Sequence, residues 1–263
     1  SWIKPAQGFS EHLAFVDPDD PAIPMNYQPP AYPFFVGIAM IAAGSLFPLI
    51  VVVVQLILHF GTAVVTSRLA ESIESSMGPV AFTLMLFNPN SFGSVFFVQS
   101  ETLNAFFVVF IVLGLFQFAR NGSFSAVAIT GIAVGLVSLT RPEGQFLMIL
   151  VPLGLLLLGL ITKGTTFWVR NLKQALFCLI ISVIVTAPWM FWNLSQGDGY
   201  RLSTGSTEYF VWGSATQIEM EQYGISGAEA EHRVREKRTE FINNYGDRWV
   251  KFSRTDQDAL LVE

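Results

Sequence analysis

Long runs of apolar residues in the middle of the chain constrain its fold more than any other feature. A membrane-spanning helix needs about 20 largely apolar residues, with a usual range of roughly 17 to 25. The first of these runs, residues 33–43, is short, and it fits an interfacial helix or the end of a span that begins at Ala31. We therefore expect an all-α protein, a polytopic transmembrane helical bundle of about six to seven hydrophobic helices. The runs cover residues 33–43, 49–70, 79–98, 102–119, 124–139, 146–162 and 175–194.

Charged residues are few and lie mainly at the two ends of the chain. They make up 13% of the 263 residues, whereas about a quarter of an average soluble domain is charged. We expect an extramembrane loop over residues 1–32, a transmembrane helical core over 33–197, and a polar segment over 198–263. The net charge of −5 offers no basic surface, so we expect no nucleic-acid partner.

The polar segment at the end of the chain carries one clear helix signal. Ser226 and Glu229 have the spacing of a capping box, which predicts a helix from this point to about Asn243. The chain starts at Ser1 without a methionine, and its last residues carry no helix stop signal. We expect it to be a fragment of a longer protein with further spans.

Lysine and arginine residues are unevenly divided between alternate connecting segments. One set of loops contains five of them, and the opposite set contains only Arg141. Because Lys and Arg in short loops are retained on the cytoplasmic side, we expect the richer set to be cytoplasmic: Arg68, Arg120, Lys163, Arg170 and Lys173. Both ends of the chain then lie on the far side, meaning periplasm, lumen or cell exterior, of a multi-pass plasma- or inner-membrane protein.

Two polar residues interrupt the second apolar run. Gln55 and His59 are one helical turn apart and should face other helices, because polar groups avoid lipid. They predict either a buried hydrogen-bonding pair or a contact to a substrate or proton. Gly131 and Gly135 form a small-xxx-small pair, which predicts close helix packing.

Residues that bind metals are scarce. The single cysteine, Cys178, lies in an apolar run and is expected to be a small core residue. The three histidines are far apart in the sequence. We therefore expect no metal site built from histidine or cysteine.

Three charged residues are predicted at one surface of the bilayer. Glu101 opens a span, and Arg141 and Glu143 lie in the tight hairpin Thr-Arg-Pro-Glu-Gly. An arginine there can bind a lipid phosphate through two parallel N–H groups, and a carboxylate can accept a proton from a hydroxyl. The alternative is structural: Arg141 pairs only with Glu143, and Glu101 stabilises the N-terminus of its helix.

The order of several short motifs along this chain resembles the GT-C class of membrane glycosyltransferases, specifically the protein-mannosyltransferase and aminoarabinose-transferase-like group. The resemblance covers roughly residues 29–210. The motifs are PPAYP at 29–33, SETL at 100–103, LTRPEG at 139–144, APWMFWN at 187–193 and STGSTEYF at 203–210. It implies transfer of a hexosyl or pentosyl group from a polyprenyl-phosphate donor to a lipid, glycan or protein acceptor at the far-side surface of the bilayer.

The resemblance also implies roles for particular residues. Glu101 is expected to be catalytic, and Arg141 and Arg201 to bind the donor phosphate. The family's loop acid would precede Ser1, so Asp17, Asp19 and Asp20 are possible substitutes, with a turn or a calcium-like role as the alternative. A divalent cation is thus possible, and no other cofactor is expected. Contacts to the sugar, or anchoring at the interface, are expected from five residues: Tyr27, Tyr32, Glu143, Trp189 and Tyr209.

Two other classes of protein compete with the enzyme. A transporter or channel also has many spans, but it predicts charges near the bilayer midplane and broken helices in related halves. A noncatalytic membrane scaffold predicts no contact to a lipid phosphate. The charges of this chain gather at one surface and its halves do not repeat, which favours the enzyme.

Overall fold

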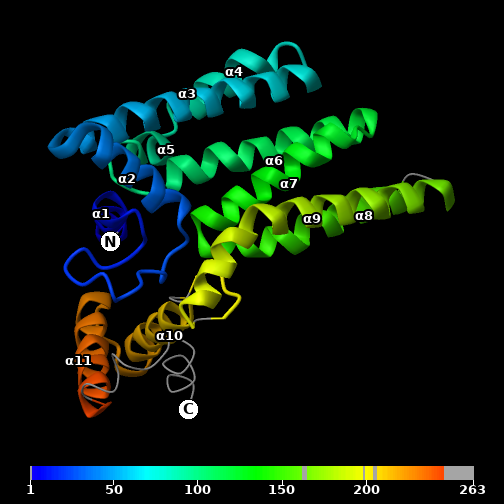
Figure 1. Ribbon diagram of the computed structural model, residues 1–263. Helices are drawn as coiled ribbons and strands as arrows, with labels where there is room; N and C mark the ends of the chain where they lie inside the picture. The colour runs from blue at the N-terminus through cyan, green and yellow to red at the C-terminus, as the bar shows by residue number, and fades with distance from the viewer. Residues whose placement is uncertain (1, 162–164, 198, 204–205, 246–263) are drawn as a thin grey trace. The chain divides into compact units, whose positions relative to one another are not determined.

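A computed structural model describes residues 2–161, 165–197, 199–203 and 206–245 (Figure 1). All regular elements in these ranges are helices, beside one isolated β-bridge between Val16 and Pro24. The expected all-α class is therefore confirmed. The chain divides into two compact units, Ser1–Trp189 and Met190–Glu263, so the predicted loop 1–32 belongs to the first unit.

The first unit is built from antiparallel helix pairs joined by short turns. α3 lies beside α4, and α6 lies beside α7 (Figure 1). Gly44, at φ 54°, allows the sharp reversal between α2 and α3. The elements are α1 (Ile3–His12), α2 (Ala31–Ala43), η1 (Gly44–Leu46), α3 (Phe47–Ile73), α4 (Met77–Leu86), α5 (Pro89–Ser94), α6 (Glu101–Asn121), α7 (Phe124–Thr140), η2 (Pro142–Phe146), α8 (Leu147–Ile161) and α9 (Thr165–Ser195).

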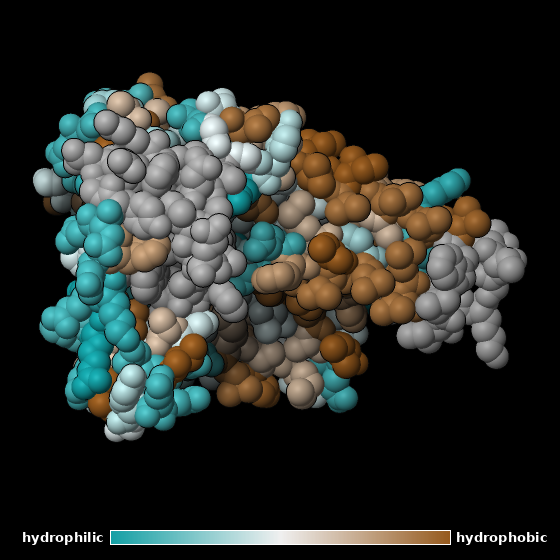
Figure 2. Space-filling model, turned by 90° about the horizontal axis from the view of Figure 1, so that it is seen from below, coloured by the Kyte–Doolittle hydropathy of each residue, from teal (hydrophilic) through white to brown (hydrophobic). Residues whose placement is uncertain are grey.

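Three helical stretches are long and apolar enough to cross a membrane: Ala31–Ile73, Glu101–Asn121 and Val169–Ser195. Shorter apolar helices cover Met77–Leu86, Phe124–Thr140 and Pro142–Leu157. Large apolar side chains on these helices are exposed, including Ile57, Ile149 and Ile184, and Figure 2 shows apolar residues forming broad surface patches. Exposed apolar surface on this scale is costly in water and suits a lipid solvent. The helices thus indicate a membrane protein.

The run 79–98 is not the single span that its hydropathy predicts. α4 ends at Leu86, and Asn88 is extended at φ −62° and ψ 117°. Pro89 disfavours the helical conformation of the residue before it. The Asn88 side chain then accepts a 3.0 Å hydrogen bond from the Ser91 backbone N–H and caps the six-residue helix α5. The prediction of one continuous helix here was wrong.

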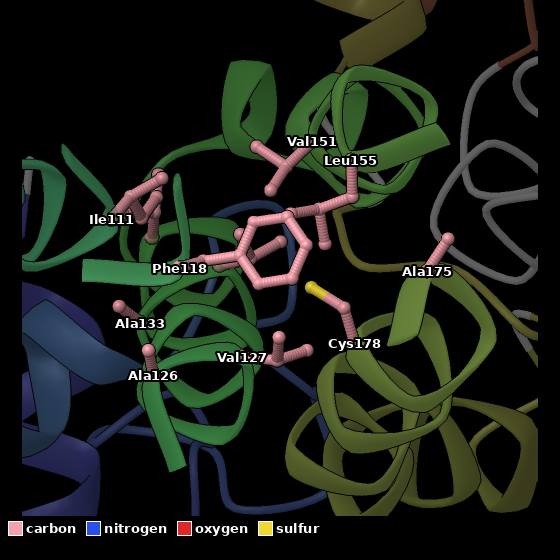
Figure 3. Close-up of a cluster of buried hydrophobic side chains, with 11 residues drawn as sticks. Ile111, Phe118, Ala126, Val127, Ala133, Val151, Leu155, Ala175 and Cys178 are labelled. Atoms are coloured by element: carbon pink, nitrogen blue, oxygen red, sulfur yellow. The ribbon is translucent and has the colours of Figure 1, made fainter. Parts of the chain in front are cut away.

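The main apolar core lies where four helices meet. Figure 3 shows Phe118 of α6 packed among Val127 of α7, Leu155 of α8 and Cys178 of α9. Cys178 is fully buried, as expected for a core residue.

The glycine pair of α7 allows close packing against α9. A Cβ atom added at Gly131 would lie 2.9 Å from the backbone oxygen of Cys178, and one at Gly135 would lie 2.6 Å from the Val185 Cβ. Both distances are too short for a real side chain. The predicted packing role of this pair is confirmed.

The second unit contains α10 (Ser206–Tyr223) and α11 (Gly227–Tyr245). The Ser226 Oγ accepts a 3.3 Å hydrogen bond from the Glu229 backbone N–H, which confirms the predicted helix start. Lys237 of α11 donates a hydrogen bond to Glu219 of α10, which raises the pKa of this lysine. The polar segment is therefore partly helical, as expected.

Candidate functional site

Glu101, Arg141 and Glu143 form one ionic cluster, although forty residues separate the first two. The Arg141 Nη1 lies 3.2 Å from the Glu101 Oε1, and its Nε lies 3.4 Å from the Glu143 Oε2. The side chain of Arg141 is 36% exposed. The sequence predicts these residues at one surface, and the structure brings them into contact.

The ends of two adjacent helices create this cluster. Glu101 is the first residue of α6, and Arg141 directly follows the last residue of α7. Arg141 leaves the helix in an extended conformation, at φ −142° and ψ 142°, because Pro142 follows it. Gly144 packs so closely on the end of α7 that an added Cβ would lie 2.6 Å from the Val137 backbone oxygen. The turn of η2 is thereby held against α7.

The ionic cluster leaves part of the Arg141 guanidinium available to a ligand. A guanidinium has five N–H donors, and the two contacts engage Nε and Nη1 only. The two carboxylates fix the plane of the group, and its Nη2 has no hydrogen bond to the described residues. An anion such as a phosphate can therefore approach from the side that the carboxylates do not occupy.

Next to the cluster is a polar cavity of about 210 Å³ between α3, α5 and α6. α3 contributes His59 and Thr62, α6 contributes Glu101 and Thr102, and α5 contributes three polar residues. Two buried atoms of lining residues, the Glu101 Oε2 and the Thr102 Oγ1, have no hydrogen-bond partner among the described residues. Glu101 thus belongs to both the ionic cluster and the cavity.

Gln55 and His59 are buried and face neighbouring segments, as predicted, but they do not bond to each other. The amide of Gln55 donates to the backbone oxygens of Val95 and Phe97, at 2.7 and 2.9 Å. The His59 Nε2 lies 3.0 Å from the backbone oxygen of Leu86. All three oxygens belong to the chain around α5, where the helix is interrupted. The polar pair of α3 therefore binds carbonyl oxygens at this interruption, and the Phe97 oxygen also accepts a 2.9 Å hydrogen bond from the Gln99 backbone N–H.

Two aromatic residues expected to contact sugar or to anchor at the interface are buried instead. Tyr32 is fully buried, and its hydroxyl donates a 3.0 Å hydrogen bond to the Gln55 Oε1. Trp189 is 6% exposed and packs edge-on against Phe15. Both rings are used in internal packing, which corrects the expectation for them. Tyr27 is half-buried.

The acidic residues of the N-terminal loop form turns. Asp17 accepts a 2.7 Å bond from the Lys4 Nζ and a 3.0 Å bond from the Asp19 backbone N–H. These bonds hold the pKa of Asp17 below its ordinary value, and the same ion pair raises the pKa of Lys4. Asp20 accepts a bond from the Ala22 N–H. The hydrogen bonds of Asp17 and Asp20 are those of turns, and the described residues contain no group of three His, Cys, Asp or Glu that could hold a metal. A catalytic role for these acids stays a prediction.

Arg201 and Tyr209 belong to the second unit. The Asn193 Nδ2 donates a 2.7 Å hydrogen bond to the Arg201 backbone oxygen, which closes the turn after α9. Tyr209 lies in α10, and its side chain falls outside the described part of the chain.

Patterns in the sequence did not predict the polar cavity. Thr102 and the polar residues of α5 fall inside apolar runs, where isolated polar groups are easily assigned to helix packing. The signal that was present is the pair Asn88-Pro89, because an Asn-Pro dipeptide favours the start of a turn. A break there turns the residues after Pro89 into a wall beside α3 and α6.

Comparisons with known families, curated proteins and solved structures find no match to this chain. The features that indicate a function are therefore the ionic cluster, the cavity and the motifs in the sequence.

Proposed function

We propose that this chain is part of a membrane glycosyltransferase, which moves a sugar from a polyprenyl-phosphate donor to a lipid, glycan or protein acceptor at the far-side membrane surface. The observation that carries the proposal is the partly exposed Arg141, oriented by Glu101 and Glu143 at the ends of apolar helices. The motifs that resemble the GT-C class include all three residues.

The position of the ionic cluster along the helices supports an interfacial site. Glu101 begins α6 and Arg120 lies in its last turn. At 1.5 Å per residue the two are roughly 30 Å apart, about the thickness of the hydrocarbon core of a bilayer. The ionic cluster therefore lies at the opposite end of α6 from a loop that is expected to be cytoplasmic.

The residues have separate roles in the proposed reaction. Arg141 binds the donor phosphate and offsets the negative charge that the carrier gains as it leaves. The acceptor oxygen bonds to the anomeric carbon, the bond from this carbon to the phosphate oxygen breaks, and a carboxylate takes the acceptor proton. Glu101 is positioned for that step, because its Oε2 has no partner among the described residues and the residue lines the cavity.

The test compares Arg141→Ala with Arg120→Ala. The second variant also removes an arginine side chain, but at the end of α6 opposite to the ionic cluster. Membranes containing the full-length protein with each substitution receive polyprenyl-phosphate donors with labelled sugars. We expect Arg141→Ala to reduce transfer by about a hundredfold or more, as loss of a group that stabilises developing charge does, and Arg120→Ala to change it little. Equal transfer by both variants would show that Arg141 does not bind the donor.

A transporter is the second candidate, because the interrupted α4–α5 segment beside a polar cavity is a feature of transporter sites. Against it, side chains of α3 already bind three carbonyl oxygens of that segment. Uptake of labelled sugars into vesicles distinguishes the two: uptake without any transfer product favours the transporter.

A further inference from the structure

We propose that the polar cavity between α3, α5 and α6 binds a single sugar ring of a substrate. This inference rests on the proposed function and names the part of the substrate that the cavity receives. It assigns to the cavity the sugar contacts that the buried rings of Tyr32 and Trp189 do not provide.

The chemistry of the lining disfavours several other ligands. Seven of the eight lining residues have a polar side chain, and a lipid chain would leave the Glu101 Oε2 and the Thr102 Oγ1 without a hydrogen bond. The lining contains Glu101 and neither lysine nor arginine, which disfavours a phosphate or another anion. With Glu101 as its one carboxylate, the cavity also lacks the ligand set of a divalent-cation site. A neutral polar group remains.

The hydrogen-bonding pattern of the lining favours hydroxyl groups. The hydroxyls of Thr62 and Ser94 donate to backbone oxygens of their own helices, at 2.9 and 2.8 Å, and so offer only lone pairs. The His59 Nε2 is the donor to the Leu86 carbonyl oxygen, 3.0 Å away. Glu101 adds a carboxylate oxygen. These acceptor oxygens match a ligand that carries several O–H donors.

Thr102 offers a further hydrogen-bonding group to a ligand in the cavity. Its side chain lies among the buried residues, at 4% exposure, and its Oγ1 has no hydrogen-bond partner among the described residues. A buried hydroxyl without a partner costs stability, so a ligand hydroxyl that pairs with it recovers this cost on binding.

The size of the cavity limits the ligand to one ring. The cavity volume of about 210 Å³ equals the volume that roughly seven water molecules occupy in liquid water. It is below the roughly 300 Å³ at which pockets for drug-sized ligands begin. The ring belongs either to the donor or to the acceptor, and the two share the same chemistry.

The first experiment fills the cavity. Ala105, a lining residue on α6, is replaced by leucine, and Ala119→Leu on the exposed part of the same helix is the control. We expect Ala105→Leu to raise KM about tenfold or more for the substrate whose ring enters the cavity: the donor in one case, the acceptor in the other. If Ala105→Leu leaves KM unchanged for both substrates while Arg141→Ala reduces transfer as expected, the inference is overturned and the proposed function stands.

The second experiment uses Thr102→Val, which removes the hydroxyl and keeps the shape. We expect the same KM to rise about three- to tenfold, as loss of one hydrogen bond does, while thermal stability stays equal or rises. A hydroxyl with only a structural role would lower stability and leave KM unchanged, and that result would contradict the assignment of Thr102.

If the wild-type protein transfers no sugar, the proposed function fails, and a binding measurement decides on the cavity. Free hexoses and pentoses at millimolar concentration are then tested for thermal stabilisation of the protein. Stabilisation that Ala105→Leu removes and Ala119→Leu keeps supports a sugar site. Absence of stabilisation in the wild-type protein would overturn the inference as well.

Discussion

The side-chain amide of Gln55 donates a 2.7 Å hydrogen bond to the backbone oxygen of Val95, forty residues later in the chain. The bond replaces part of the helical ladder that the chain around α5 lacks. Backbone groups in an apolar environment must be paired within the protein. α3 therefore stabilises the interrupted segment through side chains, and the cavity beside it depends on this support.

Replacing Gln55 with leucine should destabilise the protein by roughly 2–5 kcal/mol. The change removes one acceptor, for the Tyr32 hydroxyl, and two donors, for the Val95 and Phe97 oxygens. Gln117→Leu on α6 is the control, because no hydrogen bond of its side chain to the described residues is observed. Chemical unfolding in detergent measures both, and similar midpoints would contradict the structural role of Gln55.

Gly114→Ala should also destabilise the fold, by about 1–3 kcal/mol or more. The new methyl group would overlap the Thr130 Oγ1 and would lie 2.9 Å from the Ala126 oxygen, where α6 and α7 are in contact. Thr130 cannot move easily, because its hydroxyl is bonded to the Ala126 oxygen.

Gly154→Ala is the matched control for this change. Nothing lies within 4 Å of its added Cβ, and alanine favours a helix over glycine by about 1 kcal/mol. Its thermal midpoint should therefore equal or exceed that of the wild-type protein. A loss of stability at Gly154 similar to that at Gly114 would disprove the contact explanation.

Arg141→Lys should distinguish the contribution of the guanidinium to stability from its contribution to phosphate binding. Pairs between partly exposed side chains contribute about 1 kcal/mol or less, so the free energy of unfolding should change little. Lysine keeps the charge but loses the planar fork that binds a phosphate through two N–H groups, and KM for the donor should rise about tenfold. A lysine variant with wild-type KM would show that charge alone suffices.

The Lys4–Asp17 ion pair should make the N-terminal loop sensitive to pH. The pKa of Asp17 is lowered from 3.8, so its contribution is present above pH 3.8 and is lost as the pH falls through the lowered value. The pKa of Lys4 is raised from 10.5, so its contribution is present below pH 10.5 and is lost as the pH rises through the raised value.

Hydrogen exchange of residues 3–25, corrected for intrinsic rates, measures this effect. Protection should be constant between the two limits and decline outside them. Asp17→Asn should abolish the acidic decline, while Glu11→Gln, a change at an exposed residue, should keep it. If protection still declines at acidic pH in Asp17→Asn, another group causes that decline.

Local signals in the sequence predicted most of the helices correctly. Hydropathy located the long apolar helices α3, α6 and α9, and the capping box at Ser226 located the start of α11 to the residue. Such features depend on a few adjacent residues. Hydropathy alone failed between residues 79 and 98, because an average over a window hides one Asn-Pro pair that redirects the backbone.

Contacts between distant residues were harder to predict. The sequence placed Glu101 and Arg141 at one surface, but their 3.2 Å contact depends on the register of α6 against α7. Tyr32 and Trp189 are residue types that typically anchor a protein at the membrane interface. Both are buried by tertiary packing, which the sequence does not reveal. Amphipathic aromatic rings suit both environments, so their sequence context cannot choose between them.

The short helix α5 forms part of the cavity lining, and the long helix α3 supports the segment around it. Residues of α5 line the cavity, while the backbone oxygens of Val95 and Phe97, which follow it, accept hydrogen bonds from the Gln55 side chain of α3. Substitutions at Asn90, Ser91 or Ser94 therefore alter the wall without disturbing a long helix. Related chains can diverge in the ligand that they select while keeping α3 and α6 unchanged, and natural variation in selectivity should concentrate in these three positions.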